Sequence, residues 1–271
     1  MSNRPGCPPP ILSIAGSDCS AGAGIQADLK TIFALGGYGL TAVTSVVSET
    51  PGRVSMIHKM DEAIIRDQVE ILLSAFPIKA AKTGMLGGEE QVCAVADVWS
   101  RLGQKVPLVV DPVMVATSGG KLLQDSAIEG LCDRLLPLAT VITPNMDEAE
   151  VLWQKPVKTR GEMEACARDL ADRFQTNILV KGGHLLDDKA ADVACIGGEM
   201  HWFEVERTPG VQTHGTGCTY SAAIATALGL GHDLRQAIAH AKAYVSDAIS
   251  KHYAWTFSQH TVHALNHSVA A

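Results

Sequence analysis

The segment 214–219, with the sequence His-Gly-Thr-Gly-Cys-Thr, has the residue types of an anion-binding turn. It runs directly into an apolar stretch, 221–230, which predicts a helix that begins at the turn. The first amides of a helix have no acceptor within it, and the helix dipole favours negative charge there, above all a phosphate. An ordinary helix start, capped by Thr216 or Thr219, explains the same residues equally well.

Cys218 stands where the positive end of this helix would stabilise a thiolate. The sequence therefore predicts that the pKa of Cys218 is lowered and that the thiolate takes part in chemistry. The structural alternative is a cysteine that only packs.

Polar residues and glycines follow six predicted strands. They are Gly16 to Gly24, Ser48-Glu49, Thr83-Gly84-Met85, Asp111-Pro112, Thr143 to Glu148, and Lys181-Gly182-Gly183-His184. In open α/β sheets ligands gather beyond the carboxyl ends of the strands. Carboxylates for Mg²⁺, a lysine to offset phosphate charge and backbone donors together suit phosphoryl transfer. Taken singly, each has a structural explanation: a turn at Asp111, a helix start at Glu148, a solvated lysine at Lys181.

Short apolar runs alternate with amphipathic segments along the chain. We expect strands at 11–14, 41–47, 79–83, 106–110, 139–143 and 177–181, helices at 24–35, 61–76, 90–102, 126–136, 147–153, 161–174, 216–230 and 234–251, and a late hairpin, 190–196 with 201–206. This order predicts a single α/β domain with a mostly parallel central sheet and helices on both faces.

Composition narrows the function classes. The 271 residues are 46% hydrophobic and 5% aromatic, with a net charge of −7 and no basic run. Neither nucleic acid nor a membrane is expected as a partner. Seven cysteines without a paired spacing indicate reduced thiols and a cytoplasmic protein. Residues 1–10 are expected to form a disordered tail, and residues 253–271 a loosely packed extension.

A dinucleotide-binding reading competes with phosphoryl transfer. Residues 22–27 match the pattern G-x-G-x-x-A, and Glu49 closes the next strand as a ribose-binding acid would. The glycines begin several residues after the strand, whereas a dinucleotide turn follows its strand at once. This spacing disfavours a nicotinamide cofactor.

Together these motifs resemble the ribokinase-like superfamily, and within it the bacterial hydroxymethylpyrimidine/phosphomethylpyrimidine kinases of thiamine biosynthesis. The similarity covers about 11 to 251, and its most specific pieces are residues 15–31, 82–86, 111–114, 143–148, 181–184 and 214–219. The resemblance implies a three-layer α/β sandwich over 11–252 with eight or more strands, often dimeric, that uses ATP and Mg²⁺.

The resemblance also implies site residues. The substrate pocket would comprise Gly16, Ala23, Asp28, Val47, Glu49 and Met85. The nucleotide region would comprise Asn145, Glu148, Lys181, Thr216 and Lys242, with Asp111 and Glu148 on the metal. The catalytic set would comprise Gly215, Thr216, Gly217, Cys218 and Lys181.

Two roles are open for Cys218, which takes the place of an Asp base found in many ribokinase relatives. Either its thiolate accepts or relays the hydroxyl proton, or the side chain only shapes the anion hole and the phosphate itself takes the proton. The amides of Gly215 to Gly217 would hold the transferred group under both readings.

Glu49 departs from the family pattern, which usually has Gln at this position, and Thr50-Pro51 replaces the usual Asn-Thr. An ionised carboxylate only accepts hydrogen bonds, so it would suit a ring that carries a proton, a pyridinium or a phenolic hydroxyl. Burial that raises the pKa of Glu49 would restore amide-like behaviour.

The expected activity is phosphorylation of 4-amino-5-hydroxymethyl-2-methylpyrimidine by ATP, followed by phosphorylation of the monophosphate. A pyridoxal or pyridoxine kinase is the nearest alternative, and a catalytically weak vitamin-binding sensor is a third. The full phosphoryl-transfer set, with Lys181, Glu148 and Asp111, argues against a sensor.

Overall fold

The central feature of the computed structural model is a nine-stranded sheet. The structure describes residues 6–50, 52–114, 123–183, 185, 189–209, 211, 214–257 and 260–269. The strand order is β3-β2-β1-β4-β5-β6-β7-β8-β9. The strands are β1 (Pro10–Asp18), β2 (Tyr38–Thr50), β3 (Arg53–Lys59), β4 (Ala80–Thr83), β5 (Leu108–Val110), β6 (Val141–Ile142), β7 (Asn177–Val180), β8 (Lys189–Ile196) and β9 (Glu199–Glu206).

Six adjacent strands, from β2 to β7, pair in parallel, while β3, β8 and β9 join antiparallel at the two ends. The carboxyl ends of the six parallel strands therefore meet at one edge of the sheet. This arrangement confirms the predicted mostly parallel sheet, and the hairpin predicted late in the chain is β8 with β9.

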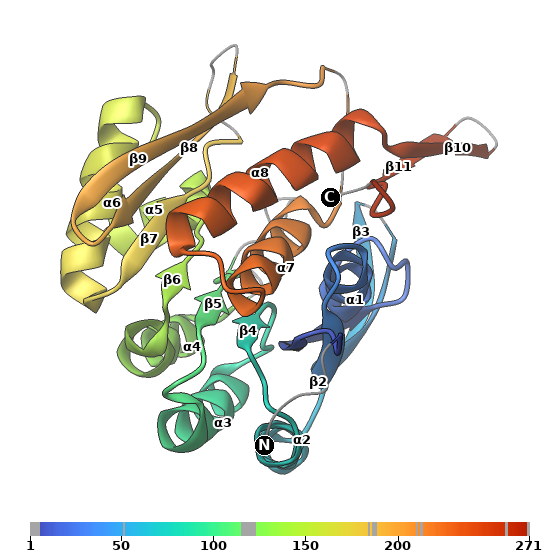
Figure 1. The fold of residues 1–271 in the computed structure, drawn as a ribbon, viewed down its shortest axis with the longest axis vertical. Helices are drawn as coiled ribbons and strands as arrows, with labels where there is room; N and C mark the ends of the chain where they lie inside the picture. The colour runs from blue at the N-terminus through green and yellow to red at the C-terminus, as the bar shows by residue number, and fades with distance from the viewer. Residues whose placement is uncertain are drawn as a thin grey trace.

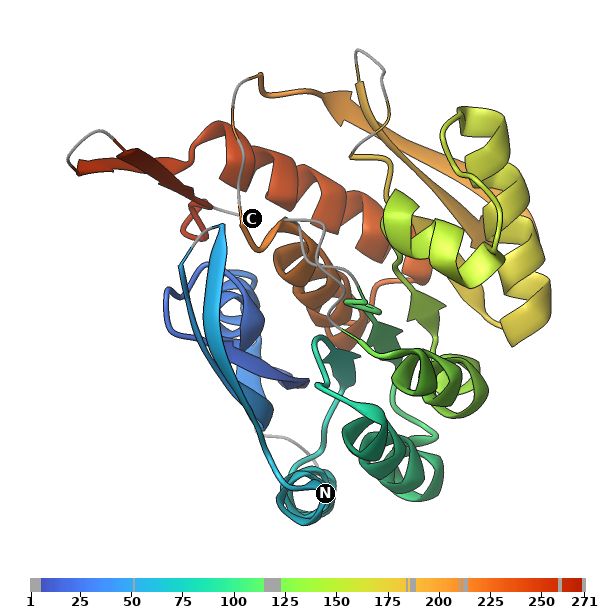
Figure 2. The same cartoon turned by 180° about the vertical axis from the view of Figure 1, so that it is seen from behind.

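Helices cover both faces of the sheet (Figures 1 and 2). On one face lie α1 (Gly24–Ala34), α7 (Thr216–Gly229) and α8 (Leu234–Ser250). On the other lie α2 (Glu62–Ala75), α3 (Glu89–Val98), α4 (Asp125–Gly130), α5 (Met146–Trp153) and α6 (Arg160–Phe174). Each face has its own cluster of buried hydrophobic side chains, so the protein is a single three-layer α/β domain.

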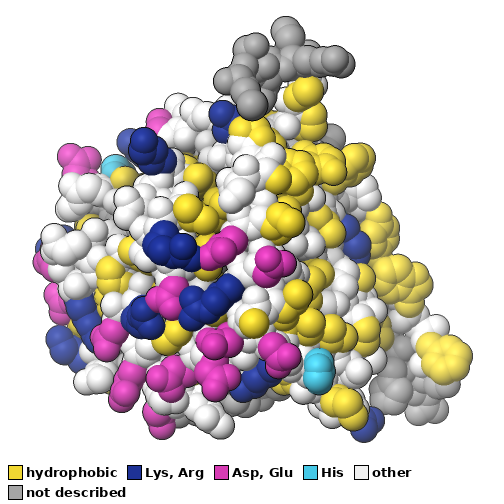
Figure 3. Space-filling model, turned by 90° about the horizontal axis from the view of Figure 1, so that it is seen from below, with side chains coloured by type: hydrophobic (Ala, Val, Ile, Leu, Met, Phe, Trp, Pro, Cys, Tyr) yellow, Lys and Arg dark blue, Asp and Glu magenta, His cyan; other side chains and the backbone are white. Residues whose placement is uncertain are grey.

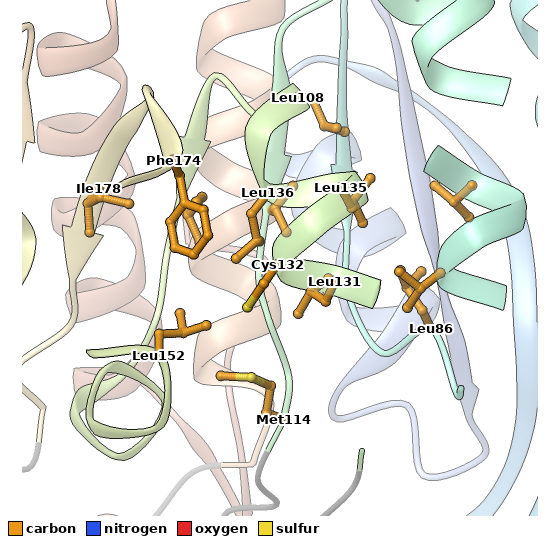
Figure 4. Close-up of a cluster of buried hydrophobic side chains, with 14 of the residues drawn as sticks. Leu86, Leu108, Met114, Leu131, Cys132, Leu135, Leu136, Leu152, Phe174 and Ile178 are labelled. Atoms are coloured by element: carbon orange, nitrogen blue, oxygen red, sulfur yellow. The ribbon is translucent and has the colours of Figure 1, made fainter. Parts of the chain in front are cut away.

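The larger cluster shows how this sequence fills a layer. After α4 the chain continues through a π-helical turn, Leu131–Leu135, and a short 3₁₀ turn, Leu136–Leu138. Leu131, Leu135 and Leu136 are fully buried or nearly so. In Figure 4 they lie beside side chains from the sheet and from the neighbouring helices. Aliphatic packing of this kind supplies most of the stabilisation of a buried parallel sheet.

Sequence periodicity shortened β1 and β2, and it missed β3 as well as the two strands of the hairpin near the C-terminus. Strand β2 runs from Tyr38 to Thr50 rather than over 41–47, and its partner β3 was not expected at all. Every side chain of β3 is exposed, so β3 lacks the buried-exposed alternation that marks a half-buried strand. Its position next to β2 at the edge of the sheet explains this exposure.

Both chain ends are more ordered than expected in their described parts. The Tyr38 N–H donates to the Pro9 carbonyl, and Pro10 is the first residue of β1. The prediction of a disordered tail over 1–10 is therefore wrong for Pro9 and Pro10, while residues 1–5 lie outside the described ones.

At the C-terminal end, β10 (Tyr253–Phe257) and β11 (His260–Ala264) form a hairpin that projects from the body (Figure 1). The chain then returns, and Leu265 and Val269 are buried in the core beneath α7 and α8, which corrects the expected loose packing.

The face in Figure 3 carries basic and acidic side chains interspersed, with hydrophobic side chains gathered to one side. Arg66 and Arg134 both pair with Asp97, and Arg101 pairs with Glu70. Opposite charges in such alternation give this face no strong field of one sign. Within the described part of the chain, none of the helices has the length and apolar character needed to cross a bilayer.

A buried ion pair joins α1 to the sheet. The Lys82 Nζ atom on β4 lies 3.1 Å from both carboxylate oxygens of Asp28, and the Ser13 hydroxyl donates to Asp28 at 2.5 Å. The side chains of Lys82 and Asp28 are 0% exposed. Each charge can be buried away from water only because the other one offsets its cost of desolvation.

We therefore predict that Asp28→Asn lowers the free energy of unfolding by about 3–5 kcal/mol, because the Lys82 charge is left without its partner. Urea unfolding of the full chain measures this. The double variant Asp28→Leu/Lys82→Met, which replaces the pair by apolar groups, should recover most of the loss. If Asp28→Asn is as stable as the unmodified protein, the pair is not a closed electrostatic unit.

Candidate active site

The turn before α7 faces the polar edge of the sheet. Gly215 is the N-cap and has a φ of 83°, in the left-handed region that glycine tolerates. The Thr219 N–H donates to the Gly215 carbonyl at 2.9 Å, and the amides ahead of that bond are those that a helix leaves for a ligand. A Cβ on Gly217 would lie 3.3 Å from the Lys181 Nζ atom and 3.4 Å from the Asp111 Oδ2 atom. The predicted anion-binding turn and the predicted charged edge therefore adjoin.

Lys181 and Asp111 form an ion pair at this edge. The Lys181 Nζ atom lies 2.9 Å from Asp111 Oδ1, and the two side chains are 13% and 4% exposed. Burial opposes the lysine charge, but Asp111 and then Glu148 outweigh it and raise the pKa of Lys181. A charged lysine next to a row of helix amides is the arrangement that binds a phosphate.

Glu148 is held by the backbone on both oxygens. It accepts from the Met114 N–H at 3.1 Å and from the Asn145 N–H at 2.9 Å, while the Asn145 side chain accepts from the Glu148 N–H. This capping box starts α5 and places the carboxylate at the edge of the sheet. Burial raises the pKa of Glu148 to about 7, although Lys181 acts in the opposite direction.

Asp111 and Glu148 suit the predicted magnesium position. Both are buried carboxylates close enough for the charge of Asp111 to raise the pKa of Glu148, and carboxylate oxygens are the ligands that Mg²⁺ prefers. The space beside Gly217, which a Cβ would fill, adjoins Asp111 and Lys181. The residues present therefore fit a magnesium-bound phosphate.

Cys218 does not have the lowered pKa that its place at the helix start predicted. Burial raises the pKa of its thiol to about 11; Lys82 lowers it, while Asp28 and Asp111 raise it further. The Gly24 N–H donates to the sulfur, which favours the thiolate only weakly. Desolvation and the two carboxylates thus outweigh the effects of Lys82 and of the Gly24 N–H, and the thiol is neutral near pH 7.

The glycine-rich loop after β1 wraps around Asp18. Its carboxylate accepts the N–H groups of Ser20, Gly22 and Ala23 at 2.7, 3.1 and 2.7 Å. Burial works against ionisation, but hydrogen bonds from the Ser20 side chain and from the Ala23 and Ser20 N–H groups, with the charge of His214, lower the pKa of Asp18. The loop is therefore a fixed shape built on one ionised side chain.

This loop touches the anion-binding turn directly. A Cβ on Gly215 would overlap the Gly22 carbonyl, and a Cβ on Gly22 would lie 3.0 Å from His214 Cδ2. The structure thus brings the turn before α7 against the loop that was predicted to hold the substrate.

Four of the expected substrate residues lie close to one another at the ends of β1, β2 and β4. Gly16 donates its N–H to the Met85 carbonyl at 3.1 Å, and a Cβ on Gly16 would lie 3.0 Å from Met85 Cε. Val47 pairs with Asp18 in the parallel register and is 3% exposed. Ala23 follows the Asp18 turn. These four residues come from three strand ends and share one small region.

Glu49 lies near a histidine and an aspartate. The His214 Nε2 atom is 3.2 Å from Asp18 Oδ2 and 3.7 Å from Glu49 Oε2, and the Glu49 side chain is 13% exposed. Burial, and next the charge of Asp18, raise the pKa of Glu49, while His214 lowers it. One ligand atom from each of the three residues lies within 4.8 Å of the others, a spacing that a metal ion could also use. The three backbone N–H groups that donate to Asp18 account for the position of its carboxylate in the loop.

Two of the predicted site residues, Asp28 and Lys242, contact the site only through another charged side chain. Asp28 is fully buried against Lys82, so it adjoins the site through that lysine rather than through an open surface. Lys242 on α8 pairs with Asp192 at 2.6 Å, and Asp192 accepts the N–H of Gly182, the residue directly after Lys181, at 2.9 Å.

The remaining predicted residues are placed as follows. Thr216 lies half-buried in the first turn of α7. His184 and Pro51, quoted in the motifs, lie outside the described residues.

Sequence reasoning gave no role to Asp18, Lys82 or His214, all of which lie in the quoted motifs. Asp18 was detectable, because an Asp followed at once by small residues and glycines is typical of a side chain that bonds nearby backbone. The partner of Lys82 is 54 residues away in sequence, and His214 is 196 residues from Asp18. No local pattern reports such pairs.

The fold and this site define an α/β kinase that acts on a small molecule. The sequence model of the family described as phosphomethylpyrimidine kinase matches residues 18–263. A hydroxymethylpyrimidine/phosphomethylpyrimidine kinase from Rhizobium meliloti is 42% identical over 242 residues, which cover 88% of this chain and 90% of that protein. The chain belongs to the phosphomethylpyrimidine kinase family and is a phosphotransferase.

Two further relatives extend the comparison. The thiamine biosynthesis bifunctional protein ThiED of Geobacter sulfurreducens is 42% identical over 239 residues, and the chain spans 49% of its length. The crystal structure of an ADP complex of Bacillus subtilis pyridoxal kinase has a TM-score of 0.87 at 34% identity, covering 96% of this chain and 98% of that one. The same fold thus serves two kinds of vitamin kinase.

The neutral thiol predicts a pH profile for alkylation. The rate at which iodoacetamide modifies Cys218, followed by peptide mass spectrometry on the folded protein, should rise about tenfold per pH unit between pH 7 and pH 9, because the thiolate fraction grows as the pH approaches about 11. A rate that is already level at pH 8 would mean that the helix dipole wins and that a thiolate is present at neutral pH.

Proposed function

We propose that the protein transfers the γ-phosphoryl group of ATP, with Mg²⁺, to the hydroxyl of 4-amino-5-hydroxymethyl-2-methylpyrimidine, and then phosphorylates the monophosphate to the diphosphate, in thiamine biosynthesis. The observation that carries this proposal is the position of Gly217 against Lys181 and Asp111. The amides of the turn, the Lys181 ammonium group and the Asp111 carboxylate lie around one space there. The loop after β1, which is proposed to hold the substrate, touches the turn at Gly215. The names of the relatives support the choice of substrate.

In this proposal the chain positions both reactants. Lys181 and the amides of Gly215 to Cys218 hold the transferring group as its charge spreads in the transition state. Asp111 and Glu148 would bind Mg²⁺, which supplies neutralisation of phosphate charge when bound. Asn145 fixes Glu148, and Lys242 fixes the strand end after Lys181 through Asp192.

The proton of the alcohol needs an acceptor, and the raised pKa of Cys218 favours one of the two roles left open. A neutral thiol is a poor base at pH 7, so we assign Cys218 the role of shaping the hole, while the phosphoryl oxygens take the proton. The charge of Lys82 is close enough to Cys218 to lower the pKa of its thiol, so Lys82 adds positive charge to the anion hole.

Glu49 favours a second candidate, a pyridoxal or pyridoxine kinase. Its carboxylate lies at the mouth of the substrate loop and accepts hydrogen bonds when ionised, as the edge of a pyridinium or a phenolic hydroxyl would require. The similarity of the fold to that of a pyridoxal kinase also supports this second candidate. Burial raises the pKa of Glu49, which makes it less different from an amide and leaves the pyrimidine as the first choice.

The assembly and location of the protein are further parts of the proposal. We expect a homodimer, and the exposed apolar side chains of Val54, Met56 and Ile57 on the edge strand β3 offer a surface for a second copy. We expect a cytoplasmic protein, since all seven cysteines are free thiols.

A coupled assay of ATP consumption tests the function directly. The protein is offered the pyrimidine alcohol, its monophosphate and the three B6 vitamers, with and without Mg²⁺. We expect turnover of both pyrimidines that depends on Mg²⁺, with kcat/KM for the alcohol above that for any vitamer. Turnover of the vitamers alone would establish the second candidate instead, and no turnover of any alcohol would contradict both.

Glu49→Gln tests the specificity residue. The amide both donates and accepts, so we expect kcat/KM for the pyrimidine alcohol, relative to that for pyridoxal, to rise by about tenfold, the value of one good hydrogen bond. The matched control is Glu206→Gln, a change at the end of β9 on the antiparallel side of the sheet. An unchanged ratio in Glu49→Gln would show that residue 49 does not select the substrate.

A further inference from the structure

The C-terminal segment after β11 lies against the turn that binds the phosphoryl group. Ala264 forms a parallel bridge with His214, the residue immediately before Gly215. The Asn266 N–H donates to the Ala248 carbonyl on α8 at 3.2 Å, and Leu265 and Val269 are 2% and 5% exposed. The segment is therefore fastened to α8 and to the start of α7 at the same time.

Among the described residues after β11, His267 has a side chain that hydrogen-bonds to α7. It is 7% exposed, and its Nε2 atom lies 3.0 Å from the Thr219 hydroxyl, which is 0% exposed. The Tyr244 hydroxyl on α8 donates to the His267 carbonyl at 2.8 Å. Both members of the His267–Thr219 pair are buried, so neither can exchange its partner for bulk water.

The imidazole is neutral in this place. Burial lowers the pKa of His267 to about 4, and the charge of Lys30 acts in the same direction. A neutral imidazole has one donor and one acceptor nitrogen, and the hydroxyl of Thr219 can complement either. The pair thus makes the same contact across the neutral pH range and does not work as a pH switch.

Thr219 belongs to the first turn of α7, where small shifts matter most. Its own N–H donates to Gly215, and the residues between them supply the amides beside Lys181 and Asp111. Hydrogen bonds aimed at a developing charge act only when their geometry is fixed in advance. A displacement of about 1 Å can cost a hundredfold in rate.

We propose that His267 is a positioning residue for phosphoryl transfer, which holds the anion-binding turn in place through Thr219 while Ala264 holds it through His214. Through these contacts residues 264–269 fix the position of the anion-binding turn. This inference rests on the proposed function, because it assigns the turn its phosphoryl group.

A double-mutant cycle in the full chain tests the proposal. His267→Ala and Thr219→Val each remove one partner, and we expect each to lower kcat by about tenfold to a hundredfold with the KM for the alcohol within about twofold. The double variant should be no slower than the worse single variant, because one contact cannot be lost twice. Thr219→Ser, which keeps the hydroxyl, should retain kcat within about twofold.

Val269→Ala is the matched control for stability. Val269 is buried in the same segment, so its truncation loosens the packing without touching the Thr219 pair. We expect a similar fall in Tm for Val269→Ala and His267→Ala, with loss of kcat only in the second. Equal loss of kcat in both, or single variants that keep kcat within about twofold, would overturn the positioning role.

Hydrogen exchange separates this inference from the proposed function. In the ligand-free protein the Thr219 amide, which donates to the Gly215 carbonyl, should exchange at least about tenfold faster in His267→Ala than in Val269→Ala, whatever the enzyme phosphorylates. A wild-type protein that turns over no alcohol would remove the proposed function and leave this result standing. Equal exchange in the two variants would remove the inference alone.

Discussion

The whole site depends on one close approach of two backbones. Gly215 and Gly22 pack so tightly that a Cβ on Gly215 would overlap the Gly22 carbonyl. This contact sets the start of α7 against the loop after β1, although the two segments are nearly two hundred residues apart in the chain. Because the loop is itself fixed on the Asp18 carboxylate, the amides proposed to hold the phosphoryl group and the loop proposed to take the alcohol are placed directly against each other.

Charge is arranged around this contact in two layers. Lys181 and Asp111 lie at the edge of the sheet, with Lys181 kept charged by its acidic neighbours. Behind them, Lys82 and Asp28 form a closed pair in the core that tolerates no unpaired member. Cys218 lies near both layers, and this explains why its thiol stays neutral at a helix start: burial and two carboxylates act against one lysine and one backbone N–H. The same reasoning is why the proposed mechanism relies on the amides of the turn and not on a reactive sulfur.

The sequence predicted the architecture well because its signals are local. Apolar runs and helix starts are written in consecutive residues, and the polar residues after the strands indicated which edge of the sheet would bind ligands. Strand β3 and the packed segment after β11 escaped prediction, since β3 is exposed throughout and the return of residues 264–269 depends on contacts with α7 and α8. The neutral state of Cys218 and the pairing of Asp28 with Lys82 escaped for the same reason, because both are set by distant residues.

The most direct test of the account follows the amides themselves. Backbone ¹H–¹⁵N spectra of the full chain are recorded with a non-hydrolysable ATP analogue, Mg²⁺ and the pyrimidine alcohol, and again with ADP in place of the analogue. The account predicts that the resonances of Gly217 and Cys218 shift strongly downfield with the analogue, since their N–H groups then donate to the γ-phosphoryl oxygens, and that the shift is largely absent with ADP. Resonances at 217 and 218 that stay unmoved while the nucleotide saturates the protein would contradict it.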